Sequence, residues 1–204
     1  MKIRKIIDIC KKNGNIIIFE SGKEQWISDG AAVFPMFNLP QFDEDSLCRT
    51  YDITDKQAAK IHFRHEYTMP AAYDFEDCTE DENVVTRGPM CLSDAGCGII
   101  PYMTSQGVAF IDAKYLQPFS DIEDSMLNLY EQHTKSGQIY FVAKSGFMLV
   151  GIILPVDAIN DQFVERLKQL TQQCEIALFN KKSAAKREAE AAIQQSVFGT
   201  EDKT

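Results

Sequence analysis

Histidine and cysteine residues gather in the middle of the chain, where their types could serve metal chemistry. His62 and His65 stand three residues apart, and Cys78, Cys91 and Cys97 follow them. Zinc prefers imidazole and thiolate ligands, but structural zinc sites usually bring cysteines in pairs separated by about two to four residues. The cysteines of this chain are farther apart. We therefore interpret them as ordinary thiols beside a surface histidine pair, and a metal-dependent enzyme stays open as an alternative function.

Acidic residues offer a second kind of chemistry. The carboxylates at 43–45 and 74–82 could hold a magnesium ion for nuclease chemistry, since hard cations prefer oxygen ligands. No basic residue stands among them at a spacing that suggests phosphate handling, and acidic runs in loops are usually solvated. The chain also lacks the G-x-S-x-G, H-E-x-x-H and C-x-x-C motifs. We therefore predict no catalytic residue and no cofactor, and favour a non-enzymatic protein.

Basic residues lie in two groups near the two ends of the chain. Each group could line a face that meets phosphate, with an affinity that falls as salt rises, or could simply keep a helix soluble. The first group consists of Lys2, Arg4, Lys5, Lys11 and Lys12, and the second of Lys181, Lys182, Lys186 and Arg187.

Composition limits the classes to which the protein can belong. The chain has 204 residues, 45% of them apolar, and a formal net charge of -9. This length fits one domain with an appendage or two small domains. The chain has no apolar run long enough for a membrane span, and charged residues interrupt its apolar N-terminal residues, unlike in a secretion signal. We expect a cytoplasmic protein, with its six cysteines as thiols.

The negative charge is concentrated in one segment. Residues 40–85 carry twelve acidic and four basic side chains, which accounts for nearly all of the net charge. Within this segment, residues 74–86 contain too few apolar side chains to offset the entropy of ordering, so we expect a solvated loop there. Both ends of the chain are close to neutral and carry the basic groups, so the acidic composition does not exclude DNA as a partner.

The N-terminal third predicts a helix followed by strands. Apolar residues at 3, 6, 7 and 10 share one face of a helix over 2–12, which Asn13-Gly14-Asn15 ends. Asp29-Gly30 lies between two strand-like runs and is typical of a β-hairpin, and we expect Trp26 to be a core residue. The other expected elements are strands at 16–19, 25–28 and 31–36 and short helices at 43–50 and 54–61.

The C-terminal half predicts a meander of strands and a long helix. The tripeptide Lys-Ser-Gly occurs at 135–137 and at 144–146, one strand length apart, which favours an antiparallel meander. Asp157 or Asn160 can begin a last helix, whose apolar stripe we expect to be buried. The expected elements are strands at 108–111, 126–131, 138–143 and 147–154 and a helical turn at 112–116, and the stripe consists of Phe163, Leu167, Leu170, Cys174 and Leu178.

These elements predict an α+β fold with a mainly antiparallel sheet, an N-terminal helix and a long C-terminal helix. The expected organisation is a domain over 1–156, a helix over 157–198 and a tail over 199–204. Within the domain, 1–66 and 107–156 are candidates for two imperfect repeats, and an acidic irregular segment at 67–106 joins them.

The N-terminal third resembles a family of uncharacterised proteins encoded by phages and prophages of Gram-positive bacteria. The residues that carry the resemblance are the basic helix, the apolar strand after it, QWISDGAAVFPMFNLP and TYDITDKQ. The resemblance implies a phage-encoded protein in the cytoplasm of a host cell, and it implies no mechanism.

A second resemblance covers about 50 residues near the end of the domain. VAFIDAKYL, MLNLY, QIYFVAKSG and FMLVGIILPV are similar to the closing segment of the bacterial DNA sliding clamp, where a strand and a short helix lead into three strands that end at a proline. The chain departs from clamps because it continues into a long helix and is too short for a ring without oligomerisation. The matching residues are Phe110, Lys114, Tyr115, Leu116, Leu154, Pro155 and Val156.

Together these observations predict a non-enzymatic, phage-type accessory protein that acts by binding, with a clamp-like DNA-metabolism module as one form of it. We expect a protein partner and no membrane, while DNA contact and self-association are open. The rival hypothesis is an acidic protein that binds a host factor or mimics DNA. The candidate interaction residues are Lys114, Tyr115, Leu154, Pro155, Val156, Lys181, Lys182, Lys186 and Arg187.

Overall fold

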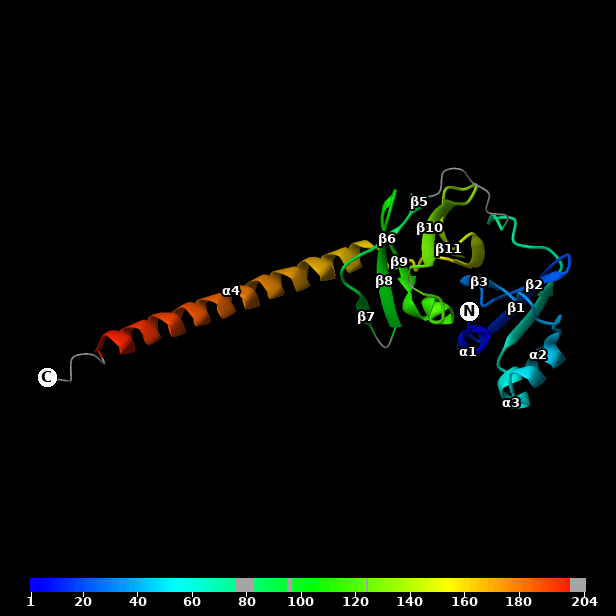
Figure 1. The fold of residues 1–204 in the computed structure, drawn as a ribbon, viewed down its shortest axis with the longest axis horizontal. Coiled ribbons are helices and arrows are strands. Elements are labelled where there is room, and N and C mark those ends of the chain that lie inside the picture. Colours follow the sequence, from blue (N-terminus) through cyan, green and yellow to red (C-terminus); the bar gives the residue numbers. More distant parts are fainter. Residues whose placement is uncertain (76–82, 95–96, 124, 199–204) are drawn as a thin grey trace. The chain divides into compact units, whose positions relative to one another are not determined.

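The computed structural model describes residues 1–75, 83–94, 97–123 and 125–198, with the side chains of 94, 97 and 193–198 left out. The chain forms two compact units, Met1–Asp157 and Ala158–Thr204. The first unit is an α+β domain, and the second contains one long helix (Figure 1). The predicted fold class, a mainly antiparallel sheet with an N-terminal and a C-terminal helix, is confirmed.

The elements follow one another in an order that alternates short helices with groups of strands. The helices are α1 (Ile3–Asn13), α2 (Glu44–Thr50), α3 (Asp55–Ala58), the 3₁₀ helix η1 (Ala113–Phe119) and α4 (Asp161–Phe198). The strands are β1 (Asn15–Ser21), β2 (Glu24–Ser28), β3 (Ala32–Pro35), β4 (His62–Glu66), β5 (Asn83–Val84), β6 (Thr86–Arg87), β7 (Leu92–Asp94), β8 (Cys97–Thr104), β9 (Gly107–Asp112), β10 (Leu127–His133), β11 (Ile139–Ser145) and β12 (Met148–Ile153).

The main sheet joins two antiparallel meanders. Its strand order is β4-β1-β2-β3-β12-β11-β10-β5, and the meanders meet where β3 pairs antiparallel with β12. Each meander follows a helix in the chain, because α1 precedes β1–β2–β3 and η1 precedes β10–β11–β12. The two halves of the domain therefore have the same order of elements, and their last strands lie side by side at the centre of the sheet.

The residue pattern of α1 explains how it covers the sheet. Ile6, Ile7 and Cys10 are almost completely buried, while the lysines of the helix lie on other faces. The helix ends where Gly14 adopts the left-handed conformation, with a φ of 67°. Its backbone also meets η1, since the amide of Lys2 donates a hydrogen bond to the carbonyl of Pro118 at 2.7 Å.

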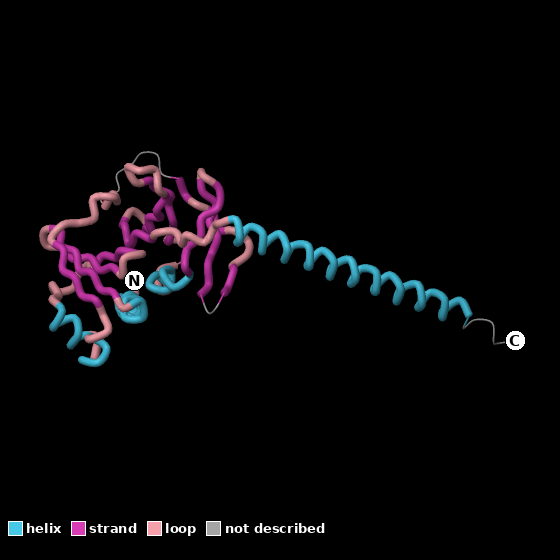
Figure 2. Tube along the Cα trace, turned by 180° about the vertical axis from the view of Figure 1, so that it is seen from behind, coloured by secondary structure: helices cyan, strands magenta, loops and turns pink. Residues whose placement is uncertain are grey.

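Both faces of the main sheet are covered within the domain. On one face, side chains such as Ile16, Phe34 and Phe141 pack with α1, η1 and α2, and the short helices of the domain lie on one side of its strands in Figures 1 and 2. On the other face, Trp26 and Tyr140 pack with residues from the segment 69–75. Trp26 is only 4% exposed, which confirms its prediction as a core residue.

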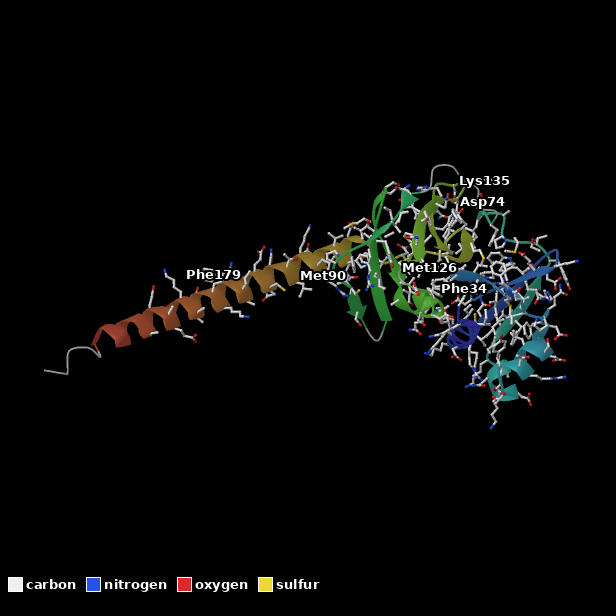
Figure 3. All side chains as sticks on the ribbon, in the orientation of Figure 1. Phe34, Asp74, Met90, Met126, Lys135 and Phe179 are labelled. Carbon is white, nitrogen blue, oxygen red and sulfur yellow. The ribbon has the colours of Figure 1, made fainter. Side chains whose placement is uncertain are left out.

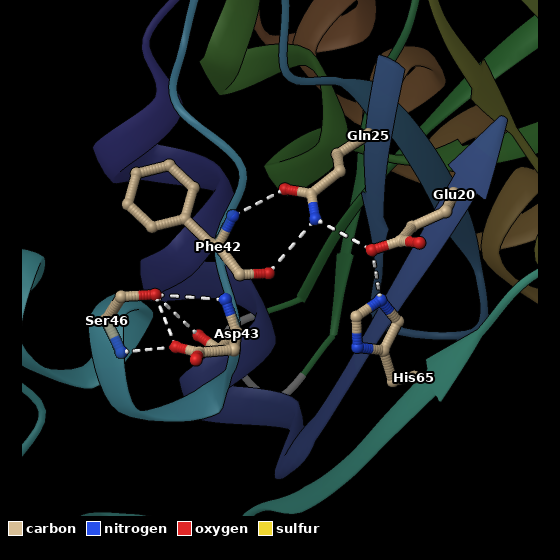
Figure 4. Close-up of polar contacts among 6 residues, drawn as sticks. All are labelled: Glu20, Gln25, Phe42, Asp43, Ser46 and His65. Atoms are coloured by element: carbon tan, nitrogen blue, oxygen red, sulfur yellow. Dashed lines mark hydrogen bonds and ion pairs between the residues drawn. The ribbon is translucent and has the colours of Figure 1, made fainter. Parts of the chain in front are cut away.

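A polar network fixes the connection between β3 and α2 (Figure 4). The buried Gln25 side chain accepts a hydrogen bond from the amide of Phe42 at 2.7 Å and donates one to its carbonyl at 3.0 Å. The same amide group reaches Glu20, which also contacts His65 Nε2 at 2.8 Å. This network joins β1, β2 and β4 to the segment that leads into α2.

The structure corrects two sequence-based expectations. The region between 62 and 104 contains β4, which pairs parallel with β1, and the eight-residue strand β8, although neither strand was predicted. β4 is mostly polar and β8 is interrupted by Gly98 and Pro101, so neither gives a clean strand pattern, and long-range pairing defines them. The prediction of a buried stripe on α4 is wrong, since Leu170, Cys174 and Leu178 are exposed.

Candidate anion-binding groove

Two elements that are far apart in the sequence bring four lysines to one cavity. Lys5, Lys11 and Lys12 come from α1 and Lys114 comes from η1, and together they line a cavity of 740 Å³. We call this cavity the lysine groove. Two acidic residues offset part of its positive charge. The complete lining is Lys5, Asp8, Ile9, Lys11, Lys12, Asn13, Gln57, Gly98, Asp112, Ala113, Lys114 and Gln117.

Asp29 connects the elements that form the groove through hydrogen bonds. Its Oδ2 accepts hydrogen bonds from Tyr115 Oη at 2.7 Å and from Asn13 Nδ2, and its Oδ1 accepts from the backbone amides of Ala31 and Ala32 at 3.0 and 3.1 Å. Asp29 belongs to the turn between β2 and β3, Asn13 ends α1, and Tyr115 lies in η1. A single buried carboxylate therefore sets the spacing of the two helices that carry the lysines.

The environment of Tyr115 shows that it is a structural residue. The side chain is 3% exposed. Burial raises the pKa of its hydroxyl well above the usual tyrosine value, and the hydrogen bond to Asp29 raises the pKa further. The phenol therefore stays protonated and serves as a donor to Asp29 at neutral pH.

Lys114 is held at the edge of the groove by three contacts. Its Nζ lies 2.9 Å from Asp112 Oδ2, 3.4 Å from Asn13 Oδ1 and 4.8 Å from the centre of the Tyr115 ring. Asp112 also caps η1, since its Oδ1 accepts from the amide of Lys114 at 3.0 Å. The Lys114 side chain is thus already ordered without a ligand. Binding therefore costs less side-chain conformational entropy at this residue.

The other lysines follow from the sequence of α1. Lys11 and Lys12 occupy its last turn, where the partial negative charge of the helix C-terminus stabilises cations. Lys5 and Lys12 are exposed, and Lys11 is half-buried. The arrangement places ammonium groups around a solvent-filled space, which suits a ligand with several negative charges.

The structure assigns different places to the other predicted interaction residues. Leu154 packs against the sheet and its amide donates to the carbonyl of Ala31, while the amide of Val156 donates to the carbonyl of Phe110. Both residues, with Pro155 between them, are half-buried at the end of β12. Lys181, Lys182, Lys186 and Arg187 are exposed on α4, in the second unit.

The residues considered for a metal site are placed differently. His62 and His65 both lie on β4, and because side chains alternate along a strand, residues three apart face opposite sides. Cys91 is exposed, with its Sγ 3.1 Å from Arg87 Nη2, whereas Cys78 and the side chain of Cys97 lie outside the described residues. In the described part of the chain, no group of three or more His, Cys, Asp or Glu side chains could hold a metal ion.

Sequence reasoning missed Asn13 and Asp29 as parts of this site. Both were interpreted only as turn residues, which they also are. The sequence offers no signal that a turn aspartate at 29 would meet a tyrosine at 115, since this contact depends on how α1 and η1 cross.

Comparison with known proteins identified no match. The chain matches none of the family models, curated proteins or solved structures with which it was compared. Among the described residues, no helix combines the length and the apolar character needed to cross a membrane. The function must therefore be argued from the groove itself.

Proposed function

We propose that the protein is a non-enzymatic accessory protein of phage DNA metabolism that binds the phosphate backbone of DNA through the lysine groove. The observation that carries the proposal is the convergence of Lys5, Lys11, Lys12 and Lys114 on one cavity. Lysines bind phosphate through charge and counterion release, without the need for a catalytic group. In this proposal the contact with DNA runs through the phosphate backbone and is therefore independent of base sequence.

The order of elements in the domain supports a clamp-like form of this proposal. Both helix-and-meander halves place their helix on the same side of the sheet, and α1 and η1 contact each other there. The lysines belong to these two helices. In this proposal the side of the sheet that carries the helices faces DNA. Lys114 belongs both to the segment that resembles the sliding clamp and to the lysine groove.

The salt dependence of DNA binding tests the proposal. For a duplex oligonucleotide, fluorescence anisotropy should give a plot of log affinity against log salt with a slope of about -3 to -4, as expected for roughly four phosphate contacts. Replacing both Lys5 and Lys12 with Gln should reduce the magnitude of this slope by about 2, since each lost phosphate contact removes about 1.

A matched control separates the groove from general charge. Lys23 lies in the turn between β1 and β2 and Lys135 in the turn between β10 and β11, both exposed and outside the groove (Figure 3 labels Lys135). Replacing these two lysines with Gln removes the same charge and should leave the slope unchanged. An absence of DNA binding at low salt, or an equal loss in both double variants, would contradict the proposal.

A further inference from the structure

The long helix α4 exposes large apolar side chains to water. Leu170, Ile176, Leu178 and Phe179 are 52–69% exposed on this 38-residue helix, and Figure 3 labels Phe179. Most helices owe their stability to the packing of an apolar face rather than to intrinsic propensity. Exposed apolar side chains along one helix indicate a surface that packs against another molecule.

Part of this apolar surface forms a continuous stripe. Leu167, Leu170, Cys174 and Leu178 follow one another at steps of three and four residues, and beyond Lys182, which lies on one flank, Ala185 and Ala189 continue the line. The mean step is close to the helical repeat of about 3.6 residues, so the stripe stays on one side of a straight helix. Its first half carries leucines and its second half carries alanines.

We propose that α4 pairs antiparallel with α4 of a second copy of this chain, with the two helices crossing at Leu178. In this register, residues equally far before and after position 178 lie level with each other. Leu167 then lies level with Ala189 of the other copy, and Leu170 lies within one residue of the level of Ala185. Large side chains meet small ones toward both ends of the contact, and Leu178 meets its own copy at the centre.

In the same register, oppositely charged residues beside the stripe of each helix lie near each other. A rotation of about 100° per residue places Glu175 and Lys182 on one flank and Arg166 and Glu188 on the other. In an antiparallel pair the same flanks of the two helices meet. Glu175 therefore faces Lys182 of the second copy, and Arg166 lies within a helical turn of Glu188. The two-fold symmetry repeats each contact.

A parallel pair of α4 helices fits these residues less well. Each residue would then lie level with its own copy, so Lys182 of one chain would lie beside Lys182 of the other. Like charges at this distance repel. The leucines would also face leucines at one end and the alanines alanines at the other, so the spacing between the helices would have to change along the pair.

Sedimentation equilibrium of the full chain tests the pairing. The wild-type protein should behave as a dimer, and Leu178→Glu should raise its dissociation constant at least tenfold by placing two carboxylates at the crossing. Ile176→Glu is the matched control, because Ile176 is 54% exposed against 52% for Leu178 but lies on the opposite face of the helix. A monomeric wild type, or equal effects of the two variants, would overturn the proposal.

A charge swap tests the orientation. Glu175→Lys should weaken the dimer about tenfold, and the double variant Glu175→Lys with Lys182→Glu should restore wild-type affinity, because the two residues face each other across the antiparallel pair. In a parallel pair these residues lie two turns apart and the second substitution cannot rescue the first. Failure of the rescue in a protein that dimerises would overturn the antiparallel register.

Discussion

At the scale of single residues, Asp29 shows how one buried polar group can organise a surface. A carboxylate is tolerated in the interior only when its oxygens have hydrogen-bond partners, and Asp29 has four donors from three parts of the chain. Its contacts with Asn13 and Tyr115 hold α1 against η1. The positions of exposed lysines in the groove therefore depend on a buried residue that does not line it.

Removal of the Tyr115 hydroxyl tests how much this hydrogen-bond network contributes to stability. Tyr115→Phe should lower the free energy of unfolding by about 1–3 kcal/mol, because it removes one donor from the buried Asp29 carboxylate. Urea denaturation measures the change. Tyr67→Phe is the control, since Tyr67 is 74% exposed, and it should change the stability by less than about 0.5 kcal/mol. Similar losses in the two variants would contradict the structural role of the hydroxyl.

At the scale of elements, short helices depend on the groups at their ends. The seven-residue helix α2 begins with a capping box, in which Asp43 accepts from the amide of Ser46 at 2.8 Å and Ser46 Oγ accepts from the amide of Asp43 at 2.9 Å (Figure 4). Few of its residues are buried, so the cap supplies much of its local stability. The side-chain hydrogen bond from Ser46 is the largest cause that lowers the pKa of Asp43.

This pKa shift predicts a pH dependence of stability. The folded state has the lower pKa, so the cap contributes stability above the unfolded aspartate value of about 3.9 and loses it as the pH falls through the folded pKa. Between about pH 5 and pH 3, the wild type should lose more stability than Asp43→Asn, which still caps but does not titrate. Chemical denaturation across this range measures the difference, and parallel curves for the two proteins would contradict the prediction.

At the scale of the domain, the two meanders depend on close packing where they meet. Gly151 of β12 faces the rings of Phe34 from β3 and Phe119 from η1, whose centres lie 5.8 Å apart. A Cβ atom at position 151 would approach the two rings to 3.0 and 3.1 Å, which is closer than ordinary contact. A methyl group at this position would therefore force the rings at the junction of the meanders and η1 to move by a few tenths of an ångström.

Gly151→Ala should therefore lower the free energy of unfolding by about 1–3 kcal/mol, the usual cost of overpacking a core. Thermal or urea denaturation measures this change. Gly98→Ala is the matched control, because its added Cβ would lie at an ordinary 3.5 Å from Ala113. A stability loss at position 98 as large as at 151 would contradict the prediction, because Gly98→Ala meets no aromatic ring.

The sequence by itself determined the elements whose signals are local. The apolar spacing of α1, the Asp29-Gly30 turn and the repeated Lys-Ser-Gly turns predicted the helix, the hairpin of β2 and β3 and the C-terminal meander, with boundaries close to those observed. These patterns are readable because a helix or hairpin is defined by residues near each other in the chain. The groups of basic residues were also visible, although their arrangement in space was not.

Only the tertiary structure decided what depends on residues far apart in the chain. It brought Lys114 to the lysines of α1, buried Asp29 beneath them, paired β4 with β1 and joined the meanders at β3 and β12. It also left Leu170 and Leu178 of the α4 stripe exposed. Periodicity shows that a face is apolar, but only packing decides which surface covers it.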